Sequence, residues 1–104
     1  MIGDDKDFIR EILGDFQLEL EDLSDKITNS IENTDISFFK MHVHCLKGIS
    51  GNVCANKLYQ VLLDIECALK SNDRILANSL MDSFIQNKRT TSDFLKKYLR
   101  LESK

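Results

Sequence analysis

Large apolar residues recur in this chain at steps of three or four. In the first third of the sequence the steps are four, four, four, three, four and four, at Phe8, Ile12, Phe16, Leu20, Leu23, Ile27 and Ile31. This is the period of one face of an α-helix, whereas a half-buried strand alternates at every second residue. The chain also has no proline and only four glycines, so it lacks the turn residues that a β-sandwich or barrel needs.

The same spacing predicts four helices, over residues 5–32, 36–52, 55–70 and 74–101. The later core positions are Leu58, Val61, Leu62, Ile65 and Leu69, then Leu76, Leu80, Phe84, Phe94 or Leu95, and Tyr98. Four amphipathic helices with short connections favour an all-α, up-down antiparallel four-helix bundle. We expect residues 1–104 to form one such domain. The first helix could be continuous, or bent or split near Gly14.

The distribution of apolar and charged residues limits the classes of protein to which this chain can belong. Apolar runs reach only two or three residues, whereas a membrane span needs about 20. The acidic start, residues 3–7, is unlike a signal peptide, so we expect a cytoplasmic protein. Residues 1–35 hold 11 acids and 3 bases, and residues 86–104 hold 6 bases and 2 acids, so we expect the first and last helices to attract each other. No aromatic residue is interleaved on a basic face, so no nucleic-acid partner is expected.

Neither a metal nor a nucleotide is expected to bind this chain. Cys45, Cys54 and Cys67 form no CxxC motif and are interpreted as small buried residues. His42, His44 and Cys45 cannot share a metal, because residues two apart on a helix point roughly 200° apart. The sequence has no phosphate-binding loop and no carboxylate cluster for Mg²⁺. A phosphoryl carrier therefore fits better than an enzyme with its own nucleotide site.

The second predicted helix carries the residues that suggest chemistry. At about 100° per residue, the core stripe comprises Phe39, His42, Val43, Leu46, Ile49 and Val53. His44 lies on the opposite face, with Lys40, Lys47, Gly48 and Gly51 around it. A helical glycine costs about 1 kcal/mol, and packing on the core does not explain two on an exposed face. An exposed imidazole beside lysines and bare backbone is typical of a nucleophile that a bulky anionic partner must reach.

Residues 44–55, His-Cys-Leu-Lys-Gly-Ile-Ser-Gly-Asn-Val-Cys-Ala, followed by Leu58, resemble the signature of the histidine-containing phosphotransfer (HPt) family, H-x-L-K-G-x-[AS]-x-x-[LIV]-G-A-x-x-L. The similarity extends over about residues 8–101. It implies a four-helix bundle that relays a phosphoryl group between its histidine and the aspartates of response-regulator receiver domains. Cys54 departs from the family pattern, which usually has glycine at that turn.

The resemblance also implies a role for each matching residue. His44 would accept the phosphoryl group on Nε2, Lys47 would lie near the phosphoryl oxygens, and Glu66 would accept a hydrogen bond from His44 Nδ1–H. The surface that docks the receiver would comprise Lys40, Met41, Gly48 and Gly51. The chain would be a monomer that holds no cofactor, and Mg²⁺ would belong to the receiver.

Two alternative functions are compatible with the same four-helix bundle. One is an interaction module that binds a partner without chemistry. The other is a donor domain phosphorylated by a histidine kinase, such as a hybrid kinase. A metal-binding bundle is disfavoured because the sequence has no Glu-x-x-His pair.

Overall fold

The computed structural model describes residues 4–32, 36–53 and 55–102, and these residues form four helices. They are α1 (Asp4–Glu32), α2 (Ile36–Asn52), α3 (Asn56–Lys70) and α4 (Arg74–Glu102). Each predicted range is confirmed to within one residue at either end. The helix α1 continues through Gly14 without a split, and α4 continues through its polar middle.

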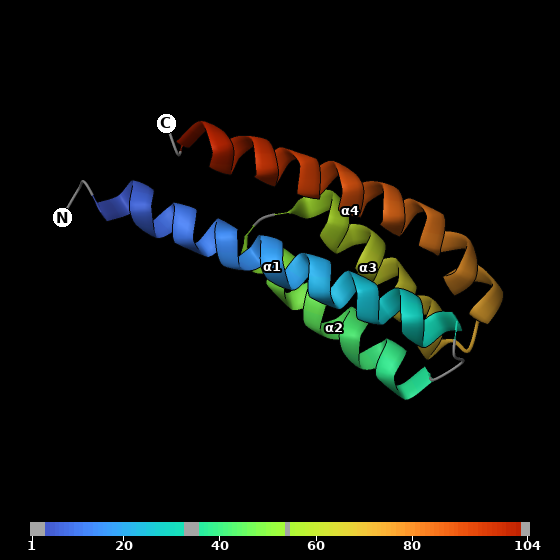
Figure 1. Ribbon diagram of the computed structural model, residues 1–104. Coiled ribbons are helices and arrows are strands. Elements are labelled where there is room, and N and C mark those ends of the chain that lie inside the picture. The colour runs from blue at the N-terminus through green and yellow to red at the C-terminus, as the bar shows by residue number, and fades with distance from the viewer. Residues whose placement is uncertain (1–3, 33–35, 54, 103–104) are drawn as a thin grey trace.

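The helices form an all-α, up-down bundle, as predicted. Each helix packs against the next one in the sequence, and α4 closes the ring by packing against α1. Figure 1 shows α1 and α4 side by side, with both chain ends at the same end of the molecule, which measures 48 × 21 × 19 Å. The outer pair, α1 and α4, has 29 residues in each helix, whereas α2 and α3 have 17 and 15.

The predicted apolar faces meet along the axis of the bundle. The most deeply buried large apolar side chains are Leu20 and Ile27 of α1, Phe39, Val43 and Leu46 of α2, Leu58, Leu62 and Ile65 of α3, and Phe84 of α4. Burying one such side chain contributes about 1.5–3 kcal/mol, so this core fixes how each helix is rotated. The side chain of Ile31 lies outside the described part of the structure.

Some predicted core positions are exposed. Phe8 and Ile12 of α1 are 61% and 38% exposed. The reason is length, because the first turns of α1 extend beyond the ends of the shorter α2 and α3 (Figure 1). On α4, Leu76 is 45% exposed, and of the pair left open in the sequence Leu95 is buried whereas Phe94 is exposed.

Backbone hydrogen bonds make the turn between α3 and α4. Asn72 has a φ of 57°, and its N–H donates to the Leu69 carbonyl, while the Asp73 N–H donates to the Ala68 carbonyl. This pair of bonds is a Schellman motif, which ends a helix where one residue adopts the left-handed conformation. The Asp73 carboxylate then accepts a hydrogen bond of 3.0 Å from the Leu76 N–H, which caps α4. The turn therefore ends α3 and starts α4 within three residues.

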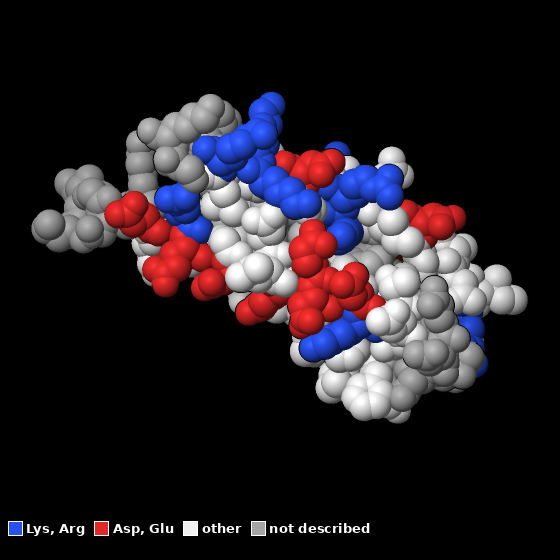
Figure 2. Space-filling model, in the orientation of Figure 1, with Lys and Arg blue, Asp and Glu red and all other residues white. Residues whose placement is uncertain are grey.

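Opposite charges lie side by side on α1 and α4, as the sequence predicts. Figure 2 shows acidic side chains along α1 and basic side chains along α4. Lys88 Nζ lies 2.9 Å from Glu21 Oε2, and Ser92 Oγ donates to Glu21 Oε1 at 2.8 Å. The Lys88 hydrogen bond is the main cause that lowers the pKa of Glu21, and the Ser92 bond adds to it.

Candidate functional site

The core stripe of α2 places His44 on the surface. Phe39, Val43 and Leu46 are fully buried, and the side chain of His44, on the other face, is 70% exposed. Since the apolar residues can be buried in only one rotation of the helix, their spacing fixes the direction in which the imidazole points. The prediction that His44 faces outward is confirmed.

Glu66 of α3 reaches across to the imidazole. Its Oε2 lies 2.8 Å from His44 Nδ1, although the two residues are 22 positions apart in the sequence. The Glu66 side chain is only 13% exposed, so it is held between α2 and α3 beneath the more exposed ring. The contact that the HPt resemblance implies between these residues is therefore present.

The charge of Glu66 defines which nitrogen of His44 carries the proton. The pKa of Glu66 is lowered, chiefly by the hydrogen bond from Lys47 and further by the bond with His44, although burial opposes the shift. The carboxyl is therefore ionised near neutral pH, and an ionised carboxylate only accepts hydrogen bonds. In the neutral ring it follows that Nδ1 is the nitrogen that carries the proton, and the lone pair of Nε2 is then available for reaction.

Lys47 also binds Glu66, a contact that the sequence did not predict. Lys47 Nζ donates to Glu66 Oε1 at 2.6 Å, and its side chain is only 16% exposed. The hydrogen bond raises the pKa of Lys47 above its ordinary value of 10.5. Glu66 thus uses one oxygen for His44 and the other for Lys47. The opposite charges of Lys47 and Glu66 are the only signal in the sequence that suggests this pair.

The two glycines near His44 have different surroundings. Apart from the backbone of its own helix, no described atom lies within 4 Å of a Cβ built on Gly48, so the surface there is open. A Cβ on Gly51 would lie 3.2 Å from two ring carbons of Tyr59. The expectation that both glycines lack an internal packing role is therefore wrong for Gly51, which makes room for an α3 side chain.

The remaining predicted positions lie around this centre. Lys40 and Met41 are exposed on α2, as a docking surface requires. Cys45 and Cys67 are free and exposed, so their interpretation as buried residues is wrong. Cys54, where the chain departs from the HPt signature, lies outside the described residues.

His42 occupies the edge of the core, as the wheel predicts. It is half-buried, and its ring stacks on Phe38 one turn earlier, with a centroid distance of 6.0 Å and an interplanar angle of 16°. It is therefore a packing residue on the flank of α2.

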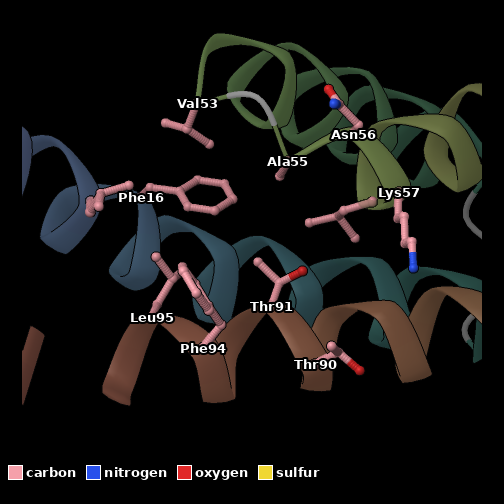
Figure 3. A pocket seen from close by; sticks show the side chains of 11 residues that line it. Phe16, Val53, Ala55, Asn56, Lys57, Thr90, Thr91, Phe94 and Leu95 are labelled. Carbon is pink, nitrogen blue, oxygen red and sulfur yellow. The ribbon is translucent and has the colours of Figure 1, made fainter. Parts of the chain in front are cut away.

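A hollow of about 350 Å³ lies away from His44, where the connection between α2 and α3 meets α1 and α4 (Figure 3). Phe16 of α1, Val53 and Ala55 at the connection, and Leu95 of α4 contribute to its mainly apolar lining. None of the predicted site residues lines this hollow, so it is separate from the candidate site.

Residues 4–32, 36–53 and 55–102 contain no group of three His, Cys, Asp or Glu side chains arranged to hold a metal ion. Within the same ranges, no helix combines the length and apolar character needed to cross a bilayer.

Comparison of the chain with protein-family models, curated proteins and solved structures gives no match.

Proposed function

We propose that this chain is a histidine phosphotransfer protein, in which His44 carries a phosphoryl group between aspartates of receiver domains. One observation carries the proposal: Nδ1 of the exposed His44 ring lies 2.8 Å from Oε2 of Glu66, whose side chain is largely buried. That bond directs Nε2 away from the protein as a nucleophile. A surface histidine without chemistry needs no such partner.

The transfer step needs little from the protein besides orientation. The Nε2 lone pair attacks the phosphorus of a receiver phosphoaspartate, the N–P bond forms, and the P–O bond breaks. The electron pair of that bond leaves with the aspartate, which becomes a carboxylate. Nδ1 keeps its proton, so the phosphorylated ring is positively charged and Glu66 offsets this charge. The reverse reaction delivers the phosphoryl group to a second receiver.

The neighbours of His44 fit this reaction. Gly48 leaves open space one turn away, where the receiver must approach closely. Lys40 is exposed on the same face, and Lys47 lies beside Glu66, so both can offset negative charge on the phosphoryl oxygens. The receiver would supply Mg²⁺, and this chain would bind no nucleotide. It would act as a phosphoryl carrier and would be active only with a partner.

Phosphotransfer from a purified receiver tests the proposal. A receiver phosphorylated on aspartate is mixed with the protein, and acid-labile phosphate on this chain is measured over time. We expect His44→Gln to abolish labelling, whereas His42→Gln, the matched control on the same helix, keeps it. Labelling that persists undiminished in His44→Gln would exclude His44 as the acceptor.

A second set of variants tests the role of Glu66 as a positioning residue. Glu66→Ala removes the acceptor for Nδ1–H, and we expect transfer to slow about 10- to 100-fold because the ring loses its orientation. Glu66→Gln keeps an oxygen acceptor and should retain much more activity. Nitrogen-15 NMR should show that Glu66→Ala also loses the preference for a proton on Nδ1. Equal activity of the two variants would contradict this role.

The same experiments separate the proposal from its alternatives. An interaction module would bind receivers without ever carrying acid-labile phosphate. A donor domain would be labelled by ATP together with its kinase and would gain nothing from a phosphorylated receiver.

A further inference from the structure

An exposed row of side chains follows α2 beside His44. Phe38, Met41, Cys45 and Gly48 are spaced by three, four and three residues, which places them on one face of the helix. All four are exposed, and the two large apolar side chains, Phe38 and Met41, are 53% and 47% exposed. We call these four residues the exposed α2 row. Large apolar side chains exposed next to a reactive group are typical of a site where another protein docks.

The row lies on one particular side of His44. Lys47 is about 60° from His44 round the helix and binds Glu66, so that direction leads toward α3. The exposed α2 row lies about 40–120° from His44 in the opposite direction. Because α2 contacts α1 and α3, the row borders α1.

Four exposed acids follow the edge of α1 that borders this row. Glu11, Asp15, Glu19 and Asp22 are spaced by four, four and three residues, and we call them the acidic row of α1. Glu21 binds Lys88 and so marks the side that faces α4. The four acids lie roughly 80–160° from Glu21 round the helix, in one sense, and therefore on the α2 side. Figure 2 shows acidic side chains gathered along α1, and Lys26 pairs with Asp22 at 3.0 Å.

The antiparallel packing brings Glu19 and Asp22, the end of the acidic row nearest the connection, to the level of the α2 row near Gly48. The connection between α1 and α2 spans residues 33–35, so residues equally distant from it along the two helices lie side by side. By this count, position 24 is level with His44 and position 20 with Gly48. The acids at Glu19 and Asp22 therefore lie beside the part of α2 that a receiver must cover.

We propose that a phosphorylated receiver docks on the exposed α2 row through an apolar surface with a basic edge, and that this edge faces the acidic row of α1. The inference rests on the proposed function. Charges differ across the docking face, with Lys40 and Lys47 at one side of His44 and, beyond the α2 row at the other, Glu19 and the Asp22–Lys26 pair. Such an arrangement permits one orientation of the partner and disfavours its reverse. The apolar contact contributes affinity, and the charges contribute orientation and association rate.

Two variants test this docking mode. In the first, Asp15→Asn, Glu19→Gln and Asp22→Asn are combined, which removes three charges from the acidic row. In the second, Met41→Lys and Cys45→Lys are combined, which places cations on the α2 row. The matched controls are Asp64→Asn, Asp82→Asn and Asp93→Asn on α3 and α4, and Ile75→Lys at an 85% exposed position. All these sites are exposed, so circular dichroism should show unchanged folding.

The probe is whichever purified phosphoreceiver transfers fastest to the wild-type protein in a profile over the receivers of the same organism. We expect both test variants to lower kcat/KM for transfer about tenfold at low salt, and the controls to change it less than twofold. The loss caused by the acid-to-amide variant should disappear at high salt, because screening already removes that attraction in the wild type.

Phosphoramidate, a small phosphodonor that needs no docking surface, provides the internal check. It should label His44 equally in the wild type and in both test variants. If the wild type accepts the phosphoryl group and the test variants transfer as fast as their controls, the docking mode is overturned and the relay function still stands. Failure of every receiver to label the wild type would instead overturn the relay function.

Discussion

Two buried serine hydroxyls show how a single atom can change stability in this bundle. Ser50 is completely buried in α2, and among the described residues its Oγ has no hydrogen-bond partner. Ser92 of α4 is also buried, but its Oγ donates to Glu21 at 2.8 Å. A buried polar group without a partner loses its hydration and gains nothing in return.

Ser50→Ala should therefore stabilise the protein by about 1 kcal/mol, since it removes an unpaired hydroxyl and alanine favours the helix. Ser92→Ala is the matched control, and it should destabilise the fold by about 1 kcal/mol, because it breaks a hydrogen bond to a carboxylate. Urea unfolding measures both. A loss of stability in Ser50→Ala would mean that its hydroxyl has a partner.

At the scale of the helix, Gly48 on the exposed face of α2 lowers the stability of the helix and leaves the surface near His44 accessible. Gly48 lies in open space, so no internal contact accounts for the absence of a side chain, whereas the Tyr59 ring limits the space at Gly51. A side chain at position 48 would project from the surface near His44. We therefore expect the two glycines to respond differently to substitution.

Gly48→Ala should raise the free energy of unfolding by about 1 kcal/mol, because alanine is the better helix former and nothing opposes its Cβ. Gly51→Ala should gain less, since its Cβ meets the Tyr59 ring at 3.2 Å. Combining Gly51→Ala with Tyr59→Ala removes that contact and so isolates its effect on stability.

Bulk at the open position should affect transfer and leave folding intact. Gly48→Leu is expected to fold normally, to accept phosphate from phosphoramidate and to react slowly with a phosphoreceiver. Receiver transfer at the wild-type rate would show that the partner does not approach this part of α2.

At the scale of the whole molecule, ion pairs among the described residues join different helices. Glu66 links α3 to α2 through Lys47, and Glu21 links α1 to α4 through Lys88. The pKa values of both carboxyls are lowered in the folded protein, so their interactions stabilise it fully above the ordinary value of about 4.5. That stabilisation is lost as the pH falls through the folded-state pKa values. The pKa of Lys47 is raised, so its contribution is complete below 10.5 and is lost as the pH rises above that value.

We therefore expect stability to decline below about pH 4.5 and above about pH 10.5. Glu66→Gln should make the decline shallower at both ends, because it removes the acid and leaves Lys47 without its charged partner. Glu21→Gln should change only the acidic side. Thermal unfolding across pH 2–12 measures these slopes, and an unchanged acidic slope when Glu66→Gln and Glu21→Gln are combined would contradict the assignment.

The period of the apolar residues determined most of the architecture. It predicts all four helices to within a residue at each end, and it predicts that His44 faces away from the core, because burial of Phe39, Val43 and Leu46 leaves only one rotation of α2. The short connections predict antiparallel neighbours, and the separated charges predict the contact between α1 and α4. These features depend on local spacing, which a sequence displays directly.

Tertiary packing decided the features that the spacing of apolar residues did not predict. Phe8 fits the helical stripe of α1 but is exposed, because α2 and α3 end before reaching it. Gly51 appears open on a helical wheel, yet the ring of Tyr59 from α3 occupies the space beside it. The shared use of Glu66 by His44 and Lys47 depends on how α2 and α3 are placed relative to each other. Spacing along one helix contains no information about the length or side chains of its neighbours, and the contacts of His44 and Gly51 depend on those neighbours.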